Sequence, residues 1–171
     1  MIFECTDEID TISLQEAVIK DIRIVDGSSK ATAESEEADV SNSSWLEIQA
    51  DAAIVKNGNS VNDYYADKYT DLMEIRFKNP VIEEILLEGH KYYDANDKLV
   101  ETVPDKPVPP EDYEKTLELF KDREVFYGGR PNSKKNCYQM IIDVEDESYV
   151  ISFFYDKVTA GWNHFLNKAN V

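Results

Sequence analysis

The sequence has few positively charged residues for its length. Its 18 Lys and Arg stand against 35 Asp and Glu, which gives a formal net charge of -17 over 171 residues. Nucleic-acid binding depends on Lys and Arg that release counterions from phosphates, and anionic membrane surfaces attract basic segments. The densest basic cluster holds only Arg130, Lys134 and Lys135. We therefore expect no nucleic-acid or membrane partner, whereas a basic protein would be attracted.

Cysteine and histidine are also scarce, with two residues of each kind. Cys5, His90, Cys137 and His164 are scattered along the chain, without the short paired spacings of a zinc site. The acids at 94–101 fit a calcium-binding loop poorly, because Lys98 stands at a ligand position and Leu99 at the position that requires glycine. A hairpin turn is therefore expected there. The sequence thus predicts no metal and no cofactor, and it predicts that both thiols are buried and free.

Long apolar runs and catalytic motifs are missing as well. No run approaches the ~18 apolar residues of a membrane span. The first ten residues, MIFECTDEID, have neither the basic nor the apolar region of a secretory signal. There is no GxSxG, HExxH or GxxxxGK[ST] motif, and Gly128-Gly129 lacks the ending of a phosphate loop. We expect a soluble cytoplasmic protein and predict no catalytic or cofactor-binding residue.

The apolar residues that are present mostly follow the two-residue period of β-strands. Strand regions are predicted at 12–25, 45–56, 72–78, 81–93, 98–103, 137–144 and 149–155. Turn residues at 57–58, 94–97 and 145–148 favour hairpins between neighbouring regions.

Three segments favour helix. Residues 111–122 give the clearest pattern, since Tyr113, Leu117 and Phe120 share one face and acids occupy the first turn. Shorter helices are predicted at 60–69, with Ser60 or Asn62 as cap, and from about residue 159 onward.

A Pro-rich stretch at 104–110 is expected to be an extended internal connector. We expect residues 1–171 to form one domain. Its fold class is α+β and β-dominated, with an antiparallel sheet, sandwich or partial barrel and one or two short helices packed on it.

The negative charge is concentrated in the first third of the chain. Residues 1–51 hold 13 acids and 3 bases, and the densest acidic segment contains Glu34, Glu36, Glu37 and Asp39. We predict these four as partner-binding residues, because clustered acids steer basic proteins toward a surface. The alternative is that the segment only confers solubility.

Three functions remain open at this stage. The first is a non-enzymatic acidic binding protein that captures a basic protein, in the manner of an immunity protein or an inhibitor. The second is an accessory or structural domain, and the third is a small hydrolase with a carboxylate-based site. An acidic face would favour binding, whereas a deep pocket with convergent polar groups would favour an enzyme. The sequence does not predict the oligomeric state.

Overall fold

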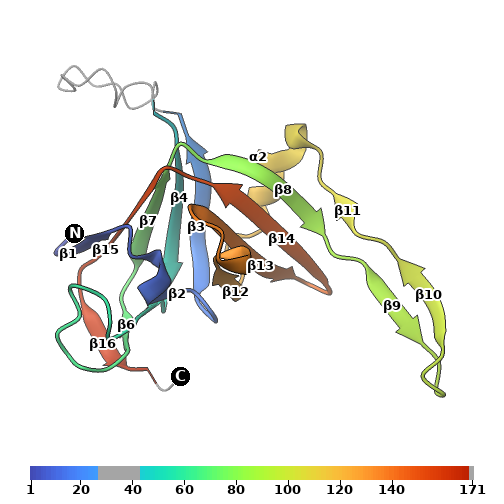
Figure 1. The fold of residues 1–171 in the computed structure, drawn as a ribbon, viewed down its shortest axis with the longest axis horizontal. Coiled ribbons are helices and arrows are strands. Elements are labelled where there is room, and N and C mark those ends of the chain that lie inside the picture. Colours follow the sequence, from blue (N-terminus) through green and yellow to red (C-terminus); the bar gives the residue numbers. More distant parts are fainter. Residues whose placement is uncertain (27–42, 170–171) are drawn as a thin grey trace.

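The computed structural model describes residues 1–26 and 43–169, and two five-stranded antiparallel sheets form its body (Figure 1). Sheet 1 has the order β1-β15-β7-β4-β3. Its strands are β1 (Phe3–Thr6), β15 (Lys157–Trp162), β7 (Met73–Lys78), β4 (Trp45–Asp51) and β3 (Val18–Val25). Strands from both ends of the chain therefore lie side by side in this sheet.

Sheet 2 has the order β11-β8-β14-β13-β12. Its strands are β11 (Lys106–Pro107), β8 (Val81–Leu87), β14 (Glu147–Phe154), β13 (Cys137–Val144) and β12 (Val125–Gly129). The predicted hairpin of 137–144 with 149–155 is confirmed as β13 and β14, which pair from Cys137 with Phe154 to Val144 with Glu147.

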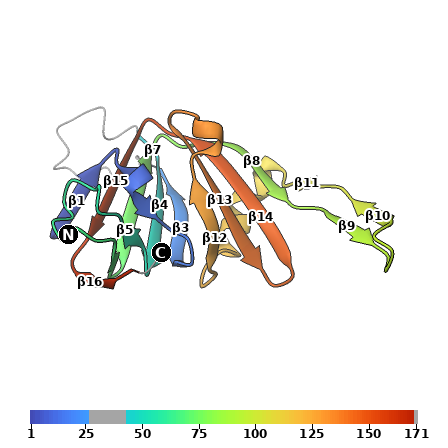
Figure 2. The same cartoon turned by 60° about the horizontal axis from the view of Figure 1, so that its bottom comes forward.

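Two smaller β structures complete the described part of the chain. A four-stranded sheet joins β16 (Phe165–Lys168), β6 (Lys68–Thr70), β5 (Ile54–Val55) and β2 (Ile12–Ser13). The hairpin of β9 (His90–Tyr93) and β10 (Leu99–Val103) projects beyond the end of β8, as Figures 1 and 2 both show. We call this hairpin the arm. Its pairing confirms the hairpin predicted around residues 94–97.

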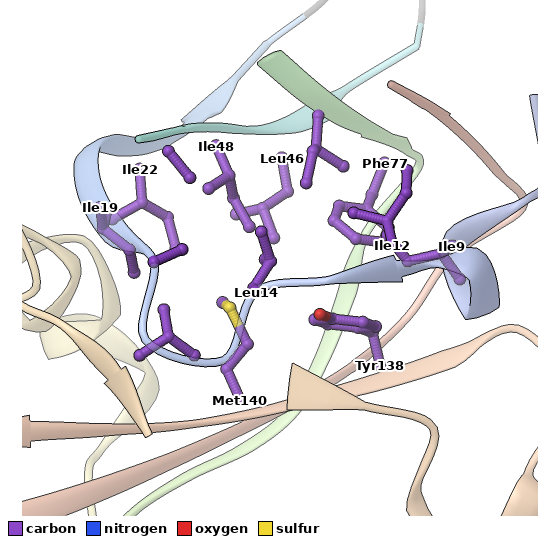
Figure 3. Packing of buried hydrophobic residues seen from close by; sticks show 14 of the residues in the cluster. Ile9, Ile12, Leu14, Ile19, Ile22, Leu46, Ile48, Phe77, Tyr138 and Met140 are labelled. Carbon is purple, nitrogen blue, oxygen red and sulfur yellow. The ribbon is translucent and has the colours of Figure 1, made fainter. Parts of the chain in front are cut away.

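The core lies between sheets 1 and 2. On β7 the apolar side chains of Met73, Ile75 and Phe77 are buried and alternate with partly exposed polar residues, as the strand period requires. Phe77 meets sheet 2 through ring contacts with Tyr138 at 5.3 Å and Phe153 at 4.8 Å. Figure 3 shows Leu14 between the apolar side chains of the two sheets. The predicted β-dominated antiparallel fold is confirmed.

Among the described residues, one short α-helix packs on these sheets. A 3-10 turn (Pro110–Asp112) leads into α2 (Tyr113–Glu118), so the predicted helix is present but shorter than 111–122. Leu117 and Phe120 are buried in the core, where the Phe120 ring contacts Tyr149 at 5.6 Å. The predicted inward face of the helix is thus confirmed.

The Pro-rich stretch is more than a connector. Lys106 and Pro107 form β11, which pairs with Leu87 and Leu86 at the edge of sheet 2. Proline is tolerated at a sheet edge, where its missing N–H leaves no interior hydrogen bond unmade.

The helix predicted at 60–69 is wrong. This segment is a loop followed by β6, and side-chain amides organise the loop. Asn62 Nδ2 donates to the carbonyls of Val55, Lys56 and Ala66 at 2.9–3.2 Å, and its Oδ1 accepts from the Tyr64 N–H. Such local side-chain bonds compete with helical hydrogen bonding.

The helix predicted from about residue 159 is also wrong, because β15 and β16 occupy that segment. Between these strands, Asp71 Oδ1 accepts hydrogen bonds from the N–H groups of Asn163 and His164, both at 3.0 Å. This turn brings Phe165 against Trp162, with ring centroids 5.5 Å apart. The helix-like spacing of the two aromatic residues therefore arises from a turn between strands.

Three predicted strand regions are interrupted. Residues 12–25 divide into β2 and β3, residues 45–56 into β4 and β5, and residues 81–93 into β8 and β9. The first two interruptions fall where Glu16 and Ala52 adopt φ of 65° and 62°. This left-handed conformation ends a strand, and here it turns the chain out of sheet 1 into the small sheet.

Candidate functional site: an acidic edge with apolar hollows

A hollow of about 640 Å³ opens where the strand interruptions at Glu16 and Ala52 meet β16. Carboxylates of Glu16, Asp51 and Asp71 line it, together with the apolar side chains of Leu72 and Leu166. The remaining lining residues are Ala52, Tyr69, Thr70 and Asn167. No Lys or Arg is among these residues, so the hollow combines apolar walls with negative charge. We call it the larger hollow.

The three carboxylates differ in what they contact. Asp71 holds the turn at Asn163 and His164 through one of its oxygens. Within residues 1–26 and 43–169, Glu16 and Asp51 form no side-chain hydrogen bond or ion pair. Leu72 and Leu166 are both exposed. A cationic side chain with an aliphatic stem, lysine or arginine, matches such a surface in both charge and polarity.

A second hollow, of about 280 Å³, adjoins the first through Glu16. Two further acids, Glu124 and Asp143, line it beside the exposed ring of Phe126. Asp143 accepts a hydrogen bond from the Ser148 hydroxyl. We call the five acids of the two hollows, Glu16, Asp51, Asp71, Glu124 and Asp143, the acidic edge.

Backbone contacts explain how distant residues meet at this edge. The turn at Glu16 is closed by the Ala17 N–H, which donates to Leu14 O at 2.9 Å. The same turn is bound to β12, since the Glu16 N–H donates to Val125 O and the Val125 N–H donates to Ala17 O, both at 2.8 Å. These bonds place Glu16 next to Glu124 and leave its side chain at the rim of both hollows.

Two other hollows of comparable size have mixed charge. One of about 360 Å³ over Gly161 is lined by Glu4 and Glu74 but also by Arg76. Another, of about 340 Å³, contains Arg130, which pairs with Asp10 at 2.8 Å, and Lys135. The two hollows of the acidic edge thus differ from these two in having no basic lining residue.

The predicted partner-binding residues Glu34, Glu36, Glu37 and Asp39 lie outside the described residues. The acidic edge itself was missed in the sequence, where its members are spread from residue 16 to residue 143. No local sequence pattern connects these acids, because their proximity depends on the strand interruptions at Glu16 and Ala52 and on strand pairing.

The cysteines are buried and free, as predicted. Burial raises the pKa of both the Cys5 and the Cys137 thiol, which keeps them protonated at neutral pH. His90 and His164 are both exposed. Asp94 Oδ1 accepts from the N–H groups of Asn96 and Lys98, as expected for a hairpin turn. Across the described residues, no group of three or more His, Cys, Asp or Glu is arranged to hold a metal.

Comparisons with known proteins returned no match, whether to family models, to curated proteins or to solved structures. No helix in the described ranges is long and apolar enough to cross a membrane. The acidic edge is therefore interpreted from its own geometry.

Proposed function

We propose that this protein is a non-enzymatic acidic binding protein that captures a basic protein, as immunity proteins and inhibitors do. The acidic edge is its contact surface, and the larger hollow receives a lysine or arginine side chain of the partner. The observation that carries the proposal is the composition of this hollow, which has three carboxylates, exposed leucines and no basic residue.

Physical chemistry supports this assignment in two ways. A net charge of -17 attracts cationic proteins and accelerates their association. The exposed apolar walls add contact area for the methylene groups of a long cationic side chain, whose charged end can reach a carboxylate at the rim. Glu16 and Asp51 are suited to this contact, because neither is engaged by another described side chain.

Small probes test the hollow directly. We expect N-acetyl-arginine amide or N-acetyl-lysine amide to shift the NMR signals of Leu72 and Leu166 in a saturable way. The norleucine analogue has the apolar stem without the charge and should bind more weakly. Binding by the norleucine and lysine probes with equal affinity would contradict a role for the carboxylates.

A charge-matched pair of variants completes this test. Glu16→Gln with Asp51→Asn should abolish the saturable shifts, because it removes the two unengaged carboxylates. Glu111→Gln with Glu114→Gln removes the same charge from exposed positions near α2 and should leave the shifts unchanged. Equal loss in both variants would show that net charge alone attracts the probe.

A further inference from the structure

A separate hollow of about 340 Å³ opens where the chain turns from β14 into β15. The segments that follow β1 and β12 meet the start of β13 at the same place. Small-molecule sites have volumes of about 300–1,000 Å³, so this hollow is large enough for a small ligand. The polar side chains that matter for such a ligand are those of Asp7, Asp10, Asp156, Arg130, Lys135 and Tyr155. We call it the Tyr155 hollow.

Tyr155 supplies a buried hydrogen-bond donor to this hollow. The residue is only 6% exposed, and its ring packs against Phe77 at 5.0 Å and Phe153 at 6.4 Å. Its hydroxyl forms no hydrogen bond with any described residue. Burial and the carboxylate of Asp10 raise the pKa of Tyr155, so the hydroxyl is protonated at neutral pH. Since the charges of Asp10 and Arg130 both act on it, the hydroxyl faces the hollow and can donate there.

Two cations stand beside this hydroxyl. Lys135 is exposed and forms no ion pair with a described residue, although three carboxylates line the same hollow. Arg130 pairs with Asp10 through Nη2 at 2.8 Å, and a guanidinium has further N–H groups to donate. A hydroxyl and two cations that converge on one space suit a carboxylate group.

The carboxylates of the hollow offer the opposite charge. Asp7 Oδ1 accepts from the Val158 N–H at 3.0 Å, and Asp156 Oδ2 accepts from Asn79 Nδ2 at 2.8 Å. These bonds hold the two side chains in place. The second oxygen of each carboxylate has no partner among the described residues. Two such oxygens suit an ammonium group.

The other hollow of mixed charge lacks this arrangement. Its cation, Arg76, is engaged by Glu47 at 3.1 Å and lies over the Trp45 ring at 4.3 Å. The hydroxyls that line it belong to Thr6 and Thr159, and neither residue is buried. Among these two hollows, only the Tyr155 hollow therefore combines a buried free donor with unengaged groups of both charges.

We propose that the Tyr155 hollow binds a small zwitterion, namely a free α-amino acid. Its carboxylate accepts from Tyr155 and Lys135, and its ammonium group donates to Asp7 and Asp156. A ligand with one charge would meet like charges in this hollow, whereas a zwitterion satisfies both sets. Ile9 is the one aliphatic residue among the described lining residues, so a short side chain suits the hollow. This site is independent of the function assigned to the acidic edge.

An NMR titration of the full chain with L-alanine tests the site. We expect saturable shifts of the Tyr155 and Lys135 signals. N-acetyl-L-alanine lacks the ammonium group and L-alanine amide lacks the carboxylate. Each should bind at least about tenfold more weakly, because it loses charge-assisted hydrogen bonds. Glycerol offers hydroxyl groups without charge and should cause no saturable shift.

A matched pair of variants locates the contact. Tyr155→Phe with Lys135→Gln keeps the ring in the core and should weaken L-alanine binding by about tenfold or more. Tyr65→Phe with Lys134→Gln removes the same groups from exposed positions outside the hollow and should leave binding unchanged.

Three results would overturn the proposal. The first is a titration in which L-alanine, glycine and L-serine all fail to produce a saturable shift. The second is binding of glycerol or of either single-charge analogue as strong as that of L-alanine. The third is equal binding of L-alanine by the two variants.

Discussion

The Tyr138 hydroxyl and the Trp162 indole N–H are buried polar groups that lack a hydrogen-bond partner among the described residues, and the hydroxyl can be removed without losing the ring. The Tyr138 side chain is 1% exposed, and its oxygen has no hydrogen-bond partner within the described residues. It lies so close to Gly128 that a Cβ there would be 2.5 Å from it. Figure 3 shows the oxygen pointing among apolar side chains. A buried polar group without a partner lowers stability.

Removing this hydroxyl should stabilise the protein. We expect Tyr138→Phe to raise the free energy of unfolding by about 1–3 kcal/mol, because it removes an uncompensated desolvation cost and keeps the ring contacts. Urea denaturation of the wild type and the variant measures the change. A marked loss of stability in Tyr138→Phe would show that the hydroxyl has a partner in solution.

Because its hydroxyl is buried, Tyr138 should make the free energy of unfolding depend on pH in the alkaline range. Burial raises the pKa of Tyr138 far above its ordinary value of 10.0. Above that pH the unfolded chain loses a proton that the folded chain keeps, so the folded state loses stability as the pH rises. This residue should contribute a decline of about 1.4 kcal/mol per pH unit. Tyr138→Phe should show a correspondingly shallower decline between pH 10 and 11, and parallel curves would contradict the assignment.

At the scale of the element, α2 gives the clearest contrast between two neighbouring positions. Leu117 is 2% exposed and packs in the core, whereas Glu118 is exposed and pairs with Lys121 at 3.0 Å. Leu117→Ala should lower the free energy of unfolding by about 2–5 kcal/mol, because it leaves a cavity. Glu118→Ala should change it by less than about 1 kcal/mol, as is usual for surface ion pairs. Equal effects in thermal or urea unfolding would refute this orientation of the helix.

Elements with one buried face could be predicted from the sequence, and elements fixed by distant side chains could not. Alternation in 72–78 and in 137–144 identifies β7 and β13, because one face of each strand packs in the core. The segments 60–69 and 159–169 look helical in sequence. Their turns depend on the Asn62 amide and on the Asp71 carboxylate, which no spacing rule includes.

At the scale of the whole molecule, the excess of acids could be predicted but the surface it forms could not. Glu16 and Asp51 belong to the acidic first third of the chain, and Glu124 and Asp143 come from its last third. These parts come together because the strands are interrupted by left-handed residues at Glu16 and Ala52, and because the Glu16 turn is hydrogen-bonded to β12. The acidic edge is thus a product of topology.

Capture of a partner from an extract of the producing cells, followed by quantitative mass spectrometry, tests the central claim most directly. The baits are the wild type, Glu16→Gln with Asp51→Asn, and the control Glu111→Gln with Glu114→Gln. A fourth bait, with Glu34, Glu36, Glu37 and Asp39 changed to Ser, tests the partner-binding residues predicted from the sequence. Each bait is used at low and at high salt.

We predict that the wild type and the control retain the same basic protein at low salt. The Glu16 and Asp51 variant should lose it, because the carboxylates that meet the partner are gone. High salt should release it from the wild type and from the control, since the Debye length falls from ~10 Å at 0.1 M to ~3 Å at 1 M. Recovery of a protein that is indifferent to salt and to these substitutions, or that is itself acidic, would contradict the account.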